Sequence, residues 1–299
     1  MSDQPAGYVV TVDRGDRIHF QDWGGPTEGG VEGRGSGVLL IHGLSGTSWN
    51  WAPVARRLAT AAPTVAMDLR GHGLSDAPTE DGAYDFATLA GDVEAVAEGS
   101  GLLDTPGSAV VLAGHGFGAM VAVVAAERLG RRCAAVVLVD GGWEPMEAAT
   151  GLDVEEFLRG LDEPPEVMGS LRAFLADRRA FDPATWDDDQ ERAARATVVE
   201  THAGRVVPAT RPHALEACVR TMFAADPVGA LASVDVPVVA LLAADGEDGS
   251  RARALAVASD AREAAGRSPI RSVSFGAVGH NLMRYRPAEV AERIQSAIP

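Results

Sequence analysis

Residues 111–121 read Val-Leu-Ala-Gly-His-Gly-Phe-Gly-Ala-Met-Val, and this stretch is the most informative indication of the fold. Its first residues belong to an apolar run that predicts a buried strand, and its last residues begin a segment with the apolar spacing of a helix. Between them, every second residue from Gly114 to Gly118 is glycine. Because glycine adopts strained turn conformations at the lowest cost, the stretch predicts a sharp strand-to-helix turn centred on Gly116.

The spacing of these glycines matches a catalytic motif at every position but one. In the Gly-x-Ser-x-Gly motif, a serine occupies the strand-to-helix turn, so that its hydroxyl stands above a sheet beside a histidine. Here Gly116 stands where the motif has its serine. The turn is therefore expected to form, but it carries no hydroxyl that could attack a carbonyl carbon.

Short apolar runs alternate with helix-like segments along most of the chain. The runs that read as strands lie at residues 17–22 (an early edge strand), 37–41, 64–67, 109–112, 134–139, 236–242 and 270–275. The segments with helical spacing lie at residues 49–58, 85–98, 118–129, 250–265 and 287–298. This alternation predicts a mostly parallel sheet that is covered by helices on both faces.

One interval, from about residue 144 to residue 232, breaks the alternation because it contains no convincing strand. Its helix-like segments lie at residues 153–160, 165–179, 185–202 and 211–225. We expect this insertion to form an all-helical cap over the carboxyl ends of the strands, where ligands bind in such sheets. The acidic residues 187–189 lie near a helix start, where carboxylates interact favourably with the helix dipole, so a metal site there is the weaker interpretation.

The composition indicates one large enzyme-like unit and excludes some partners. The chain has 299 residues and a net charge of −16, which opposes nucleic acid and anionic membranes as partners. All of its basic residues are arginine, so Schiff-base chemistry through a lysine is excluded. The sequence shows no signal peptide and no membrane-spanning run, so a cytoplasmic location is expected. Its two cysteines, Cys133 and Cys218, are expected to be packed thiols, and no metal or cofactor is expected.

Four motifs in order give the chain a resemblance to a known family. They are the residues 38–44 (Val-Leu-Leu-Ile-His-Gly-Leu), 68–76 (Asp-Leu-Arg-Gly-His-Gly-Leu-Ser-Asp), 114–118 and 279–282 (Gly-His-Asn-Leu). Together they resemble the successive signatures of the α/β-hydrolase fold family. The resemblance implies a mostly parallel sheet of about eight strands. It also implies a core of residues 1–143 and 233–299, with residues 144–232 as the helical cap.

The resemblance also implies roles for individual residues. His280, in the loop after the last strand, resembles the general base of the family. The backbone N–H groups of Leu44 and Phe117 would form an oxyanion hole, which does not depend on a serine hydroxyl. His42 and Trp143 are expected to contact the substrate.

The carboxylate partner of His280 should follow a core strand near residue 242. Asp245 is favoured because it is nearest to the end of that strand, and Asp248 is an alternative. Asp140, which ends the preceding core strand, is a third candidate.

The missing hydroxyl limits what this site can do. Removing a triad serine leaves on the order of 10³- to 10⁴-fold acceleration over water. We therefore expect an enzyme that uses His280 as a base on water or on the substrate, which would be a small, largely apolar ester, lactone or ketone. Two alternatives stay open: a serine ester hydrolase that is inactivated by the substitution at position 116, and a non-catalytic ligand-binding protein. The oligomeric state is not predicted.

Overall fold

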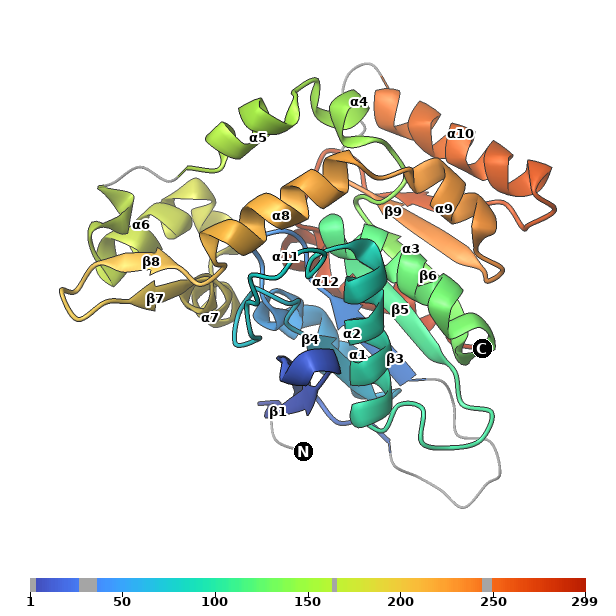
Figure 1. Ribbon diagram of the computed structural model, residues 1–299, viewed down its shortest axis with the longest axis horizontal. Coiled ribbons are helices and arrows are strands. Elements are labelled where there is room, and N and C mark those ends of the chain that lie inside the picture. Colours follow the sequence, from blue (N-terminus) through green and yellow to red (C-terminus); the bar gives the residue numbers. More distant parts are fainter. Residues whose placement is uncertain (1–3, 27–36, 163–165, 244–248) are drawn as a thin grey trace.

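The computed structural model describes residues 4–26, 37–162, 166–243 and 249–299. Its main sheet has eight strands in the order β1-β2-β4-β3-β5-β6-β9-β10. Figure 1 shows how the strands and helices of the chain are arranged. Strands β1 and β2 pair antiparallel, as do β2 and β4, and every other pair in the sheet is parallel. The predicted mostly parallel sheet of about eight strands is confirmed. The strands are β1 (Ala6–Thr11), β2 (Arg17–Asp22), β3 (Gly37–Ile41), β4 (Thr64–Met67), β5 (Val110–His115), β6 (Cys133–Val139), β9 (Val238–Leu242) and β10 (Arg271–Ser274).

Helices cover both faces of this sheet. On one face, α1 (Ala52–Leu58) and α12 (Pro287–Gln295) pack against side chains such as Val38 and Leu40 of β3. On the other face, α2 (Phe86–Gly99), α3 (Phe117–Leu129) and α10 (Ser250–Ala264) pack against side chains such as Leu39 and Ile41. Because every residue of β3 is buried, its sequence is an unbroken apolar run rather than an alternating one.

Strand β1 is an element that the sequence pattern did not predict. The pattern placed the edge strand at residues 17–22, but β1 pairs with these residues along their whole length and lies outside them. Five of the six residues of β1 are exposed, and its sequence, Ala-Gly-Tyr-Val-Val-Thr, shows neither the long apolar run of a buried strand nor a strict alternation of polar and apolar residues. The opposite edge of the sheet is β10.

The insertion between β6 and β9 is not all-helical, and this corrects the prediction. It contains a two-stranded antiparallel hairpin, β7 (Val198–Glu200) and β8 (Val206–Pro208), where the sequence suggested that a helix continued to residue 202. Three residues are too few to show a strand periodicity. The helices of the insertion are α4 (Met146–Thr150), α5 (Val154–Gly160), α6 (Leu171–Phe181), α7 (Asp188–Ala196), α8 (Pro212–Phe223) and α9 (Pro227–Ser233).

Ion pairs and hydrogen bonds attach the insertion to the sheet-bearing part of the chain. Arg56 of α1 makes a bidentate pair with Asp189 of α7, with N–O distances of 2.8 and 3.0 Å. Arg284 of α11 (Leu282–Tyr285) donates to the side chain of Thr185 and to the carbonyl of Asp182. Asp187 caps α7 and Asp189 pairs with Arg56, so two of the three acidic residues 187–189 have structural partners.

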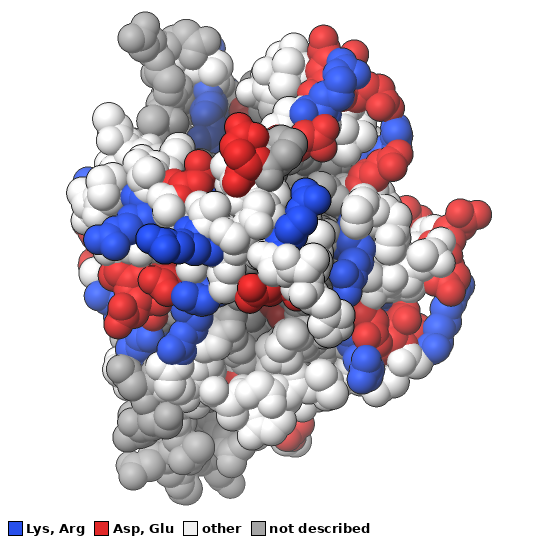
Figure 2. All heavy atoms as spheres, turned by 90° about the vertical axis from the view of Figure 1, so that its left-hand side faces the viewer, with Lys and Arg blue, Asp and Glu red and all other residues white. Residues whose placement is uncertain are grey.

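The surface carries charges of both signs in spite of the net charge of −16. On the face that Figure 2 shows, basic and acidic side chains lie in small neighbouring groups. Neither sign forms a continuous field on this face. Within the described ranges, none of the helices is long and apolar enough to cross a membrane. Cys133 and Cys218 are free and buried, and burial raises the pKa of each thiol to about 12.

Candidate active site

A cavity of about 440 Å³ lies at the carboxyl ends of β3, β5 and β6. Its floor is formed by strand ends and the turns that follow them, which include Leu44, Gly116 and Asp140. Its other walls come from the insertion, from residues of α4, α5 and α8. Apolar side chains dominate these walls: Met120, Met146, Ala149, Phe157 and Met222. We call this space the Gly116 cavity.

Gly116 forms the turn between β5 and α3 that the sequence predicted. Its φ of 52° and ψ of −114° are strained for any residue with a side chain. The following helix approaches β3 closely, since a Cβ on Gly118 would lie 2.3 Å from the carbonyl oxygen of His42. A Cβ built on Gly116 would point at His280 and lie 3.3 Å from its Nε2 atom. The space above Gly116 is therefore the space that the imidazole faces.

Asp140 orients the imidazole of His280. Its Oδ2 atom lies 2.6 Å from Nδ1 of His280, and its side chain is 1% exposed, whereas that of His280 is 62% exposed. Because the carboxylate accepts, Nδ1 carries the proton and Nε2 presents its lone pair towards Gly116. Asp140 has a φ of 52°, one of three positive φ angles at non-glycine residues in the described ranges. This strain, which costs about 1–3 kcal/mol, is typical of a functional position.

The carboxylate at His280 therefore belongs to the third of the three predicted candidates. Asp245 was favoured from the sequence, with Asp248 as an alternative, and both lie outside the described residues. Strands β6 and β9 are parallel neighbours in the sheet, so both strands end at the same edge. The sequence alone therefore did not distinguish the aspartates that follow the two strands. The contact itself is made by Asp140.

Arg251 is a second partner of Asp140 that was not predicted from the sequence. Its guanidinium donates to Oδ1 of Asp140 at 2.7 Å and to Glu144 at 3.2 Å. Burial acts to raise the pKa of Asp140, but hydrogen bonds from His280 and Ala243 and the charge of Arg251 outweigh it, so the pKa lies below its usual value. The Asp140 carboxylate thus stays ionised among three donors, His280, Ala243 and Arg251.

This lowered pKa predicts a specific acid sensitivity. A carboxylate whose pKa is lower in the folded than in the unfolded chain stabilises the fold above its unfolded pKa, about 3.9, and this contribution is lost as the pH falls through the folded value. We expect Asp140→Asn to lower the free energy of unfolding above about pH 4, and the difference from the wild type to narrow below it. Denaturant unfolding of both proteins across this range measures the difference. A difference that is independent of pH would contradict the assignment.

Two residues that line the same cavity have backbone N–H groups that are candidate donors. Phe117 begins α3 and Leu44 follows β3, and both residues line the Gly116 cavity. Among the described residues, neither backbone N–H donates to a protein acceptor. Free N–H groups at a helix start favour a negatively charged oxygen.

His42 and Trp143, which were expected to contact the substrate, lie behind the cavity walls. The ring of His42 is fully buried, where its Nε2 accepts from the N–H of Leu69 at 2.9 Å and its Nδ1 donates to the carbonyl of Gly43 at 2.7 Å. Burial lowers its pKa, so it is held neutral. Trp143 is also fully buried, and the guanidinium of Arg251 lies 5.1 Å from its ring. Both residues are thus part of the buried structure around the site and do not line the cavity.

His115 is a neighbour of His280 in the structure. Its ring centroid lies 4.4 Å from that of His280, and its Nε2 donates to the backbone carbonyl of His280 at 3.1 Å. Burial, followed by the charge of His280, lowers the pKa of His115 to about 3. A neutral His115 therefore holds the loop that carries His280. Its position beside Gly116 in the motif was the available signal.

The nearby hydroxyl groups are poorly placed to replace a serine at position 116. Thr47 and Ser48 are buried and do not line the Gly116 cavity. Ser45 lines a neighbouring cavity instead. Thr150 does line the Gly116 cavity, but its hydroxyl donates to the carbonyl of Met146 at 2.7 Å.

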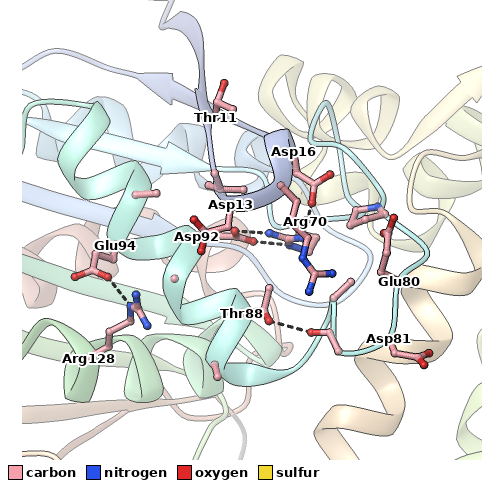
Figure 3. Close-up of a pocket in the computed structure, with 18 of the residues that line it drawn as sticks. Thr11, Asp13, Asp16, Arg70, Glu80, Asp81, Thr88, Asp92, Glu94 and Arg128 are labelled. Carbon is pink, nitrogen blue, oxygen red and sulfur yellow. Dashed lines mark hydrogen bonds and ion pairs between the residues drawn. The ribbon is translucent and has the colours of Figure 1, made fainter.

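Another cavity, of about 590 Å³, lies elsewhere and is lined by charge pairs (Figure 3). Arg70 binds Asp92 through two nitrogens and Asp16 through a third. Glu94 pairs with Arg128 on the same wall. These side chains satisfy one another, which is typical of a structural network. In the described ranges, no cluster of three or more histidine, cysteine, aspartate or glutamate residues is placed to hold a metal ion.

Comparisons with known proteins agree with this geometry. The sequence model of the Alpha/beta hydrolase family matches residues 38–293. The 2-(acetamidomethylene)succinate hydrolase of Mesorhizobium japonicum is 33% identical over 52% of this chain and 53% of its own length. The N-formylmaleamate deformylase of Pseudomonas putida is 31% identical over 64% of this chain and 63% of its own. The chain thus matches about half of one relative and just under two thirds of the other.

A solved structure extends the likeness over nearly the whole chain. The crystal structure of E-2-(acetamidomethylene)succinate hydrolase superposes with a TM-score of 0.74 and covers 98% of both chains. Its sequence identity of 22% makes this a likeness of fold.

Proposed function

Because the chain belongs to the alpha/beta hydrolase family, we propose that it hydrolyses an acyl bond, such as an ester, lactone or amide, in a small molecule without forming a covalent bond to its substrate. One observation carries this proposal: an oriented histidine faces a turn that has no side chain. Nδ1 of His280 lies 2.6 Å from Asp140, and its Nε2 faces Gly116. The named relatives, a hydrolase and a deformylase, support acyl chemistry.

In the proposed reaction, a water molecule occupies the space above Gly116. His280 accepts a proton from this water at Nε2 while the water oxygen attacks the carbonyl carbon of the substrate. The imidazolium then donates the proton to the leaving group, as the bond between the carbonyl carbon and the leaving group breaks. Asp140 stays ionised and stabilises the imidazolium, as the carboxylate of a triad does.

The oxyanion of the tetrahedral intermediate requires donors on the other side of the carbon. We assign this role to the N–H groups of Leu44 and Phe117, which line the cavity and have no protein acceptor within the described ranges. One such donor typically contributes about 10²- to 10³-fold to turnover. A glycine at the turn leaves both of these donors intact.

The insertion then acts as the cap of the site, and we propose residues 144–232 as its extent. Met146, Phe157 and Met222 from this segment form an apolar wall of the Gly116 cavity. Such a wall favours an apolar part of the substrate beside the reacting carbonyl.

A turnover survey tests the proposal. We expect the wild-type protein to hydrolyse at least one member of a panel of small aryl esters, lactones and N-acyl amides, with a rate on the order of 10³- to 10⁴-fold above water. Product formation is followed by liquid chromatography, with heat-unfolded protein as the control. Ligands that raise the unfolding temperature but are never cleaved would identify a binding protein instead.

A further inference from the structure

A second cavity, of about 310 Å³, adjoins the Gly116 cavity under the other half of the insertion. The two cavities share consecutive residues of the same loops. Leu44 lines the first cavity and Ser45 the second, and His280 lines the first while Asn281 lines the second. The second cavity therefore lies beside the proposed reacting centre. We call it the Arg284 cavity.

Two asparagines on its wall accept a backbone hydrogen bond at their side-chain oxygens. Oδ1 of Asn50 accepts from the N–H of Thr47 at 2.7 Å, and Oδ1 of Asn281 accepts from the N–H of Arg284 at 3.3 Å. A backbone N–H can only donate, so these contacts fix the oxygen end of each amide. Among the described residues, no acceptor takes the NH₂ group of either side chain. Both residues therefore offer donors to a ligand.

Arg284 adds a positive charge that is bound only to neutral groups. Its Nε donates to the hydroxyl of Thr185 at 2.6 Å, and one terminal nitrogen donates to the carbonyl of Asp182 at 2.7 Å. In the part of the chain that the structure describes, no carboxylate lies within ion-pair distance of this guanidinium. The two contacts hold the planar group in place and leave donors for a further acceptor.

The charge of the two cavities differs. The Gly116 cavity carries the carboxylates of Asp140 and Glu144 against the single guanidinium of Arg251. The wall of the Arg284 cavity, within the described residues, holds the guanidinium groups of Arg284 and Arg178 and no carboxylate, although Nε of Arg178 lies 3.8 Å from the carboxylate of Asp177 outside the wall. This charge is local, because the outer face of the insertion mixes both signs (Figure 2). An anionic group on a substrate is thus repelled from the first cavity and favoured in the second.

We propose that the Arg284 cavity binds a carboxylate of the substrate, through the guanidinium of Arg284 and the amide donors of Asn50 and Asn281. This inference rests on the proposed function for the identity of the reacting centre, and it defines the substrate class as an acyl compound with a carboxylate on one arm and an apolar group on the other. Planar guanidinium and amide donors match the geometry of a carboxylate.

Binding measurements test this without any turnover. The probes are 4-phenylbutyrate and its uncharged analogue 4-phenylbutanamide, and isothermal titration calorimetry measures their affinities. We expect the wild type to bind the acid at least about tenfold more tightly than the amide, since hydrogen bonds to charged groups are the strong ones. Asn50→Asp keeps the oxygen that accepts from Thr47 but replaces the donor with a negative charge, so it should abolish the preference. Arg284→Met should abolish it too.

Arg286→Met is the matched control, because Arg286 lies two residues away and does not line the cavity. It should keep the preference for the acid, and circular dichroism establishes that each variant is folded. Equal or undetectable binding of the two probes by the wild type would overturn the proposal, as would a preference that survives in a folded Asn50→Asp protein. Turnover of neutral esters with no preference for the acid would defeat this inference alone. A preference for the acid without any turnover would defeat the proposed function alone.

Discussion

We expect a fluorophosphonate to label the Gly116→Ser protein at a single residue, the new serine. The wild-type protein should stay unmodified. A Cβ at position 116 already lies 3.3 Å from Nε2 of His280, so a hydroxyl on it comes within hydrogen-bond reach of the base after a small shift of the imidazole. The N–H groups of Leu44 and Phe117 would bind the phosphonyl oxygen. Intact-mass spectrometry should show one adduct on Gly116→Ser and none on the wild type.

The Gly116→Ala protein is the matched control for this experiment. The φ of 52° is unfavourable for either side chain, so both variants should lose about 1–3 kcal/mol of stability. Only the serine variant gains a nucleophile, and only it should be labelled. A folded serine variant that does not react would contradict the proposed alignment of position 116 with His280. An adduct on the wild type, for example on Ser45, would contradict the absence of a nucleophile.

Loss of the imidazole is expected to produce the largest fall in turnover. His280→Ala should reduce the rate by about 10²- to 10⁴-fold, the usual contribution of a general base. His280 is 62% exposed at its side chain, so its removal leaves no large void, but the buried Asp140 carboxylate loses a donor, and the free energy of unfolding should fall by about 1–3 kcal/mol. Steady-state rates on the best substrate of the panel measure the effect.

His202→Ala is the matched control, because His202 is an exposed histidine in the turn between β7 and β8. Its turnover should equal that of the wild type. A His280→Ala protein that keeps full activity would exclude His280 as the base and, with it, the activation of water above Gly116.

The sheet could be predicted from the sequence where its strands are buried on both faces. The bounds of β2, β3 and β4 match the predicted residues, since unbroken burial or strict alternation gives a clear signal. The strand β1, whose apolar residues Tyr8 and Val9 are exposed, and the three-residue strands of the hairpin show neither pattern. Their positions depend on pairing with distant residues rather than on their own pattern.

The turn at Gly116 and the position of the proposed base, His280, could be predicted from the sequence. The side chains that contact His280 and Asp140 could be predicted less well. The Gly-x-Gly-x-Gly turn at residues 114–118 and the loop of His280 are local features, and the structure brings them together. The carboxylate depends on three-dimensional detail, because β6 and β9 end at the same edge and the positive φ of Asp140 turns its side chain towards the histidine.

Long-range contacts also explain the misplaced and missing residues. His42 follows a core strand, as a substrate-binding residue would, but its ring turns inward to accept from Leu69, which lies 27 residues further along the chain. Arg251 reaches Asp140 across 111 residues. Neither contact can be predicted from the residues that are near in sequence, because each joins residues far apart in the chain.

The central claim is that hydrolysis at this site proceeds without a substrate-derived group on the protein. The most direct measurement is the intact mass of the wild-type protein in samples quenched with acid at intervals during turnover of its best substrate. We predict an unchanged mass at every interval while product accumulates, because His280 delivers water to the carbonyl directly. An acyl adduct that forms and decays at the rate of turnover, on any side chain, would contradict the account.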